Sequence, residues 1–123
     1  MPDEIMIVHP RARHIRIEED DDTIVDAYYR SGQLHRDDGP AVLRRRPDGS
    51  VQAQYWQNGR MHRLEGPAWV DRHLDGTGYE AYYRDGLLHR DDGPAQIIRR
   101  AAGGVEEAYF RNGQRSAQGA SSS

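Results

Sequence analysis

Short runs of alternating apolar and polar residues, separated by turn residues, follow one another along this chain. From position 41 the order is A-V-L-R-R-R, the turn P-D-G-S, V-Q-A-Q-Y-W-Q, the dipeptide N-G, and R-M-H-R. Each run has the length of a β-strand, and Asn-Gly supplies the positive φ angles that a two-residue hairpin turn requires. The pattern predicts strands over 41–46, 51–57 and 60–63, and helix has little support anywhere.

The same pattern returns every 27 residues. The segments AYYRSGQLHRDDGPAV at 27–42, QYWQNGRMHRLEGPAW at 54–69 and AYYRDGLLHRDDGPAQ at 81–96 align without a gap, and a fourth copy begins at 108. Such self-similarity is the signature of a repeat architecture, in which each unit contacts mainly its neighbours. The predicted fold is therefore all-β, with tandem 27-residue antiparallel hairpin and meander repeats that form an elongated twisted sheet or an open solenoid.

These repeats divide the chain into segments. The repeat domain is assigned to 14–113, after an N-terminal segment at 1–13, and residues 117–123 are expected to form a disordered tail. The units of the domain are a half unit at 14–26, full units at 27–53, 54–80 and 81–107, and a partial unit at 108–116.

The turn at 58–59 sets the pairing across the second hairpin, with Trp56 opposite Met61 and Tyr55 opposite His62. Neighbours on a strand point to opposite faces, so these two pairs occupy different faces of the sheet. The face of Trp56 is expected to be the core, because its positions vary among large hydrophobic residues. The other face carries a tyrosine in all four units, opposed by a histidine in three of them.

This second face has two readings. The tyrosines and histidines could form a ladder that recognises a partner, or a structural device in which hydroxyl and imidazole groups satisfy neighbouring backbone groups. In the motif H-R-x-(D/E)-G-P, the acid is expected to cap the turn, and the arginine to pair with an acid. The residues assigned to partner binding are Tyr28, Tyr55, Tyr82, His35, His62, His89, Arg36, Arg63 and Arg90.

Composition narrows the chemistry. The chain has no cysteine, and all 17 of its basic residues are arginine, which excludes disulfides, thiolate catalysis and Schiff-base lysines. Only 36% of the residues are hydrophobic, so a thin core is expected. No apolar run approaches a membrane span, and the N-terminus lacks the features of a signal peptide. We therefore expect a soluble, cytoplasmic protein with no membrane partner.

Catalysis and metal binding are disfavoured by the geometry of the repeat. Neighbouring strands lie about 4.8 Å apart, so equivalent histidines on successive units are separated by roughly 10–14 Å. A zinc–nitrogen bond is about 2.1 Å long, so these histidines cannot share one ion. An active site is usually single, whereas this constellation occurs three times. We expect no enzyme activity, no metal and no cofactor.

Nucleic acid is the alternative partner. Arginine patches at 44–46 and 99–100 could contact phosphates, and the tyrosines could stack on bases. The net charge is −3, however, and residues 18–22 are all acidic. This alternative therefore ranks below a protein partner.

The repeated motif Y-(Y/W)-x-(N/D)-G-x-(L/M)-H-R-x-(D/E)-G-P-A resembles the MORN-like repeats, in the variant found in viral, phage and bacterial proteins. The resemblance implies an elongated antiparallel β array and a role in protein–protein interaction rather than catalysis. It also suggests an accessory protein of a virus or phage that binds or inhibits a host factor. Because a thin sheet would expose aromatic residues, a homodimer is a further hypothesis.

Overall fold

A computed structural model describes residues 12–116 of the chain, and this region is all-β, as predicted. It contains no α-helix, and a single 3₁₀ turn, η1, covers Ala101–Gly103. The strands are β1 (Ala12–Glu18), β2 (Ile24–Arg30), β3 (Gln33–Leu34), β4 (Val42–Arg45), β5 (Val51–Gln54), β6 (Trp56–Gln57), β7 (Arg60–Met61), β8 (Trp69–Arg72), β9 (Gly78–Ala81), β10 (Tyr83–Arg84), β11 (Leu87–Leu88), β12 (Gln96–Arg99), β13 (Val105–Arg111) and β14 (Gln114–Ser116).

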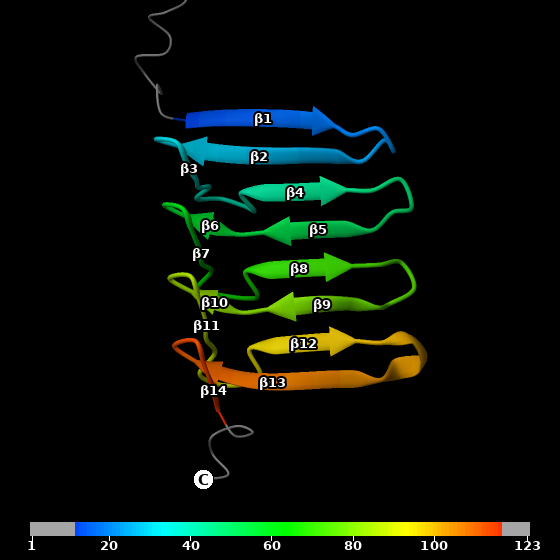
Figure 1. Ribbon diagram of the computed structural model, residues 1–123, viewed down its shortest axis with the longest axis vertical. Helices are drawn as coiled ribbons and strands as arrows, with labels where there is room; N and C mark the ends of the chain where they lie inside the picture. Colours follow the sequence, from blue (N-terminus) through cyan, green and yellow to red (C-terminus); the bar gives the residue numbers. More distant parts are fainter. Residues whose placement is uncertain (1–11, 117–123) are drawn as a thin grey trace, which may run out of the picture.

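The longer strands form one antiparallel meander. Their order is β1-β2-β4-β5-β8-β9-β12-β13-β14, and β3 joins β2 to complete a ten-stranded sheet. Two further pairs, β6–β7 and β10–β11, make small hairpins of their own. Figure 1 shows the long strands lying across the long axis of the molecule, with the hairpins in a column along one side. In this region no helix is long and apolar enough to cross a membrane.

The predicted hairpin pairing is confirmed. Trp56 lies opposite Met61 in the second hairpin, and the first and third hairpins pair Tyr29 with Leu34 and Tyr83 with Leu88. Both residues of the turn at 58–59 have positive φ, 50° and 80°. This is the conformation that the Asn-Gly signal predicts.

The strand expected over 51–57 is wrong in one respect, because it divides at Tyr55 into β5 and β6. The Tyr55 N–H donates to the carbonyl of Ala68 at 2.7 Å, while its own carbonyl accepts from the N–H of His62 at 3.0 Å. Tyr55 is thus the residue at which backbone hydrogen bonding passes from the main sheet, through its N–H, to the hairpin, through its carbonyl. The partner strand β8 begins just after Pro67, which has no N–H to extend the ladder further.

Aspartates close the turns at the opposite ends of the strands. Asp48 and Asp75 each accept the backbone N–H of the residue two positions on, at 2.8 and 2.9 Å. The same oxygens accept the hydroxyls of Ser50 and Thr77, both at 2.7 Å. These bonds lower the pKa of both carboxyl groups, chiefly through the Ser50 hydroxyl for Asp48 and the Thr77 backbone for Asp75. Each turn is an Asx turn that its own side chain stabilises.

The expected core face needs correction. Its aromatic side chains at 29, 56, 83 and 110 are all only half-buried. Hydrogen-bond register places the fully buried apolar residues on both faces of the sheet. Large rings on one thin sheet can shield one another only partly, whereas small side chains are covered by their neighbours. The buried hydrophobic residues are Val25, Ala41, Met61, Ala68, Ala81, Ala95 and Ile97.

Alanines and tyrosines alternate across the strands on the face opposite Trp56. Tyr28 donates its N–H to the carbonyl of Ala41, and Ala41 donates to the carbonyl of Gln54, so Ala41 lies between Tyr28 and Tyr55. Ala41 and Ala68 are completely buried. The row of tyrosines is therefore spaced by alanines, of which Ala41 and Ala68 have no exposed surface.

Candidate interaction groove on the loop side

The predicted binding residues gather beside the hairpin column, around the loops that follow β3, β7 and β11. Between the first two loops runs an open groove, to which Arg36, Tyr55, His62 and Arg63 all contribute. Tyr28 and His35 line a neighbouring depression beside β1, together with Arg36. The remaining residues of the groove wall are Gln33, Asp37, Asp38, Gly39, Gln57, Asn58, Arg60, Leu64, Glu65 and Asp85.

An arginine covers each of the three tyrosine rings. The guanidinium carbon of Arg63 lies 3.9 Å from the centre of the Tyr55 ring. The equivalent distances are 3.8 Å for Arg36 on Tyr28 and 4.0 Å for Arg90 on Tyr82. A guanidinium is attracted by the negative face of an aromatic ring, so each stack holds its loop against the sheet.

The same arginines anchor the loops by a second contact. Nη1 of Arg63 donates to the carbonyl of Pro67 at 3.1 Å. Equivalent bonds join Arg36 to Pro40 at 3.3 Å and Arg90 to Pro94 at 3.1 Å. Each arginine therefore closes its own loop.

The acids of these loops do not cap the turn, contrary to the sequence-based expectation. Asp38 and Asp92 have side chains 87% and 89% exposed, and among residues 12–116 each pairs only with the arginine two residues earlier, at 3.3 and 3.4 Å. The loop needs no cap at these positions, because the arginine already binds the proline carbonyl. The expected pairing of arginine with an acid is confirmed in these two loops.

The histidines join one hairpin to the next. Nδ1 of His35 accepts the backbone N–H of Asn58 at 2.9 Å. His62 accepts that of Asp85 at 2.8 Å, and His89 that of residue 112 at 3.0 Å. Their side chains are only 5%, 18% and 11% exposed, so the imidazoles do not form an open ladder. Each imidazole satisfies a backbone donor, as the structural reading of these rings predicts.

The hydrogen bonding of Nε2 distinguishes His62 from His35 and His89. Nε2 of His35 lies 2.9 Å from Asp37, and Nε2 of His89 lies 2.9 Å from Asp91. At the equivalent position the second loop has Leu64, and Nε2 of His62 has no hydrogen-bond partner among residues 12–116. The Leu64 side chain itself is 70% exposed.

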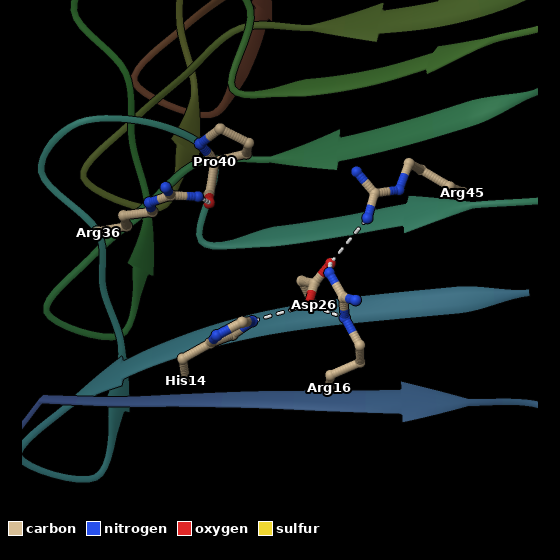
Figure 2. Close-up of polar contacts among 6 residues, drawn as sticks. All are labelled: His14, Arg16, Asp26, Arg36, Pro40 and Arg45. Carbon is tan, nitrogen blue, oxygen red and sulfur yellow. Dashed lines mark hydrogen bonds and ion pairs between the residues drawn. The ribbon is translucent and has the colours of Figure 1, made fainter.

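Asp26 is a buried charge that sequence reasoning missed. It is 4% exposed and accepts two hydrogen bonds from Arg16, at 2.8 and 3.1 Å. His14 and Arg45 approach it at 2.7 and 3.2 Å, so that three basic side chains surround one carboxylate (Figure 2). The hydrogen bonds from Arg16, assisted by His14, lower its pKa to about 2 despite burial. The available signal was an acid two residues before Tyr28, on a strand whose neighbours carry basic residues at nearby positions.

The arginine patches at 44–46 and 99–100 are neutralised within the protein. Arg45 binds Asp26, and Arg100 binds Glu106 at 2.7 Å. Each of the other three also lies within 4 Å of a carboxylate: Arg44 of Glu19, Arg46 of Asp71 and Arg99 of Glu80. Counter-charges within the fold thus occupy the positions that phosphates would need.

Among residues 12–116 no group of three histidine, cysteine or acidic side chains could hold a metal ion. The tail expected at 117–123 lies outside the described residues, as do residues 1–11 of the N-terminal segment. Compared with models of known protein families and with curated proteins, the chain has no match. The groove offers anchored cations, carboxylates, one imidazole and one exposed leucine.

Proposed function

We propose that this protein is a non-enzymatic interaction module, and that the groove between the first two loops binds a segment of a partner protein. The observation that carries the proposal is the fixed geometry of its polar walls. Arg36, Arg63 and His62 are each held by contacts within the protein, while Leu64 projects into solvent beside them. A site whose side chains are already ordered loses little conformational entropy on binding.

The composition of the groove suits a protein segment. It offers guanidinium groups, carboxylates and one exposed aliphatic side chain over a surface that two loops contribute. Interfaces between proteins combine an apolar contact with a rim of polar groups, and arginine and tyrosine are enriched in them. Nucleic acid ranks second, because the arginines of the sequence patches already have carboxylate partners.

The array as a whole is proposed to be MORN-like, made of tandem 27-residue units in an elongated, twisted or solenoidal sheet. Support comes from contacts that recur at this interval, since three arginine–tyrosine stacks and three histidine–backbone bonds join equivalent positions. The resemblance suggests a viral or phage accessory protein that acts on a host factor in the cytoplasm. We propose no catalytic role for the array.

Self-association is proposed through β1, the edge of the meander. All seven of its residues are exposed, and within the described region it pairs only with β2. Ile15 and Ile17 are 39% and 51% exposed on this edge. An edge strand presents unpaired backbone groups to which a second copy can add its own strand.

Charge reversal tests the groove. In Asp38→Arg/Glu65→Arg two exposed groove acids become basic, and the control Asp20→Arg/Glu107→Arg makes the same charge change on exposed residues elsewhere. Each bait is used for affinity capture with quantitative mass spectrometry, and the captured protein is then purified and titrated by calorimetry. We expect the affinity of the groove variant alone for this protein to change by about ten-fold or more, because the charges that the groove presents to its partner are reversed.

Equal affinity of both variants for the purified partner would refute the groove as the binding site. A titration of the native chain with single- and double-stranded oligonucleotides completes the test. Salt-sensitive binding there, with no protein captured, would favour the nucleic-acid alternative instead.

A further inference from the structure

The second unit differs from both neighbours at several positions of the groove wall, and two of these differences, at 60 and 64, concern hydrogen-bond donors. Where the first and third units have an aspartate beside the histidine, Asp37 and Asp91, the second has Leu64. Where they have Gln33 and Leu87, the second has Arg60. Both changes fall on the wall of the groove described above.

These changes leave two hydrogen-bond donors without an acceptor. Nδ1 of His62 accepts a backbone N–H, so the hydrogen of the neutral imidazole is carried by Nε2. Within residues 12–116 this Nε2 has no acceptor, and the Arg60 guanidinium has neither a hydrogen bond nor an ion pair. Arg60 is exposed, so its charge is available to a partner.

The neighbouring units show which group such an imidazole binds. In both of them a carboxylate oxygen lies 2.9 Å from Nε2. Each of these carboxylates also has an arginine nearby, Arg30 at 3.9 Å from Asp37 and Arg84 at 3.6 Å from Asp91. The second unit has Gln57 where these arginines stand, so the neighbouring loops are an internal example of the histidine–carboxylate contact, and Arg60 would supply the cation from a different position.

We propose that His62 is a carboxylate-binding site, filled by an aspartate or glutamate side chain of the partner segment. The partner's carboxylate accepts from Nε2 of His62 and is attracted by Arg60, while an aliphatic group beside it contacts Leu64. This proposal rests on the proposed function, because it names the chemistry of the segment that the groove binds. It assigns the second unit a role that the first and third cannot share.

Charges on the groove also restrict the ligand. Four carboxylates line it too, those of Asp37, Asp38, Glu65 and Asp85, and the Asp85 carboxylate is 3.4 Å from Nδ1 of His62. They oppose a second negative charge, while Arg36 and Arg63 are occupied by their tyrosine rings. A single carboxylate flanked by apolar residues fits this balance better than a strongly acidic stretch does.

The test uses the full chain with ¹⁵N-labelled histidine, whose ring nitrogens are followed by NMR. The probes are N-acetyl-aspartate methylamide and its asparagine analogue. We expect a saturable shift of His62 Nε2 with the aspartate probe, and about ten-fold or more weaker binding of the asparagine probe, as for loss of a charged hydrogen-bond acceptor. His35 and His89, already bound to their own aspartates, should not respond.

Exchanging the loop residues tests the assignment in both directions. Leu64→Asp supplies an internal carboxylate, so its His62 signal should move toward those of His35 and His89, and the probe response should vanish. Leu64→Ser, whose hydroxyl has no charge and a shorter reach, should keep the response. Asp91→Leu should create a response at His89.

The proposal is overturned if His62 does not respond to the aspartate probe up to its solubility limit, or if Leu64→Asp responds as the native chain does. Binding of the variants to the captured partner distinguishes failure of the carboxylate site from failure of the proposed function. If Leu64→Asp binds the partner as tightly as Leu64→Ser while Asp38→Arg/Glu65→Arg binds with changed affinity, the groove stands and the carboxylate site falls.

Discussion

Asp26 shows how one side chain can bind the first strand to the rest of the sheet. Arg16 and His14 come from β1, Asp26 from β2 and Arg45 from β4, so one carboxylate receives hydrogen bonds from both neighbouring strands. Hydrogen bonds between charged groups contribute more than neutral ones, and burial shields them from salt. The edge strand is therefore held by charge as well as by its backbone ladder.

Replacing Asp26 by asparagine should destabilise the protein by about 1–3 kcal/mol, because the bonds to charged partners are lost while the donors remain. The folded-state pKa of about 2 lies below the ordinary 3.8. The stabilisation is therefore complete above about pH 5 and is lost as the pH falls toward about 2. Urea unfolding followed at several pH values measures both effects.

Asp20→Asn is the matched control, since this exposed residue lies in the turn before Thr23. We expect it to leave the stability at pH 7 nearly unchanged. A native-like loss of stability below pH 5 in Asp26→Asn would contradict the assignment of that loss to this carboxylate.

Arginine–tyrosine stacking is the second residue-scale prediction. Arg90→Met and Tyr82→Leu each remove one side of a stack that lies away from the proposed groove. A double-mutant cycle should give a coupling of about 0.5–1 kcal/mol, the range for partly exposed cation–π pairs. Additive effects of the two changes on the free energy of unfolding would show that the contact between the two side chains contributes no stability.

At the scale of elements, buried alanines separate the tyrosines of neighbouring strands. Ala68 donates its N–H to Ala81 and accepts that of Tyr55, and its side chain is completely covered. A larger side chain there has no space without displacing a ring or its stacked arginine. The small residue is thus required by packing rather than by strand propensity.

Ala68→Leu should therefore lower the free energy of unfolding by about 1–3 kcal/mol, the usual cost of overpacking a filled site. The control Ala101→Leu lies at an exposed turn and should change it by no more than about 0.5 kcal/mol. Urea unfolding of both variants provides the comparison. Equal stabilities would mean that the ring above Ala68 moves aside freely.

At the scale of the whole molecule, the meander ends in an exposed strand, β1, from which the homodimer hypothesis follows. Light scattering coupled to size-exclusion chromatography should give a dimer mass for the native chain, and a monomer for Ile17→Lys, which places a charge on this edge. The control Leu74→Lys changes a residue that is 81% exposed at a turn, and should remain dimeric. A 14.0 kDa species for the native chain at high concentration would refute the dimer.

The local part of this architecture could be predicted from the sequence. The turn dipeptides set the hairpin register, so that Trp56 faces Met61 as expected. The division of the strand at Tyr55 could not be foreseen, because it depends on where β8 begins across the sheet. Leu64 differs from the aspartates of the other units in the alignment. Its consequence, an Nε2 of His62 without an acceptor, depends on the orientation of the His62 ring.

The sequence by itself determined the all-β class, the turn positions and the strand pairing, because these depend on the alternation of side chains and on the backbone conformations that Gly, Asn and Pro allow. Only the tertiary structure decided where the charges and rings lie. It buries Asp26 among three basic groups, turns His35 toward the next hairpin and stacks Arg36 on Tyr28. These contacts join residues from different strands and loops, and their distances depend on how the whole sheet is assembled.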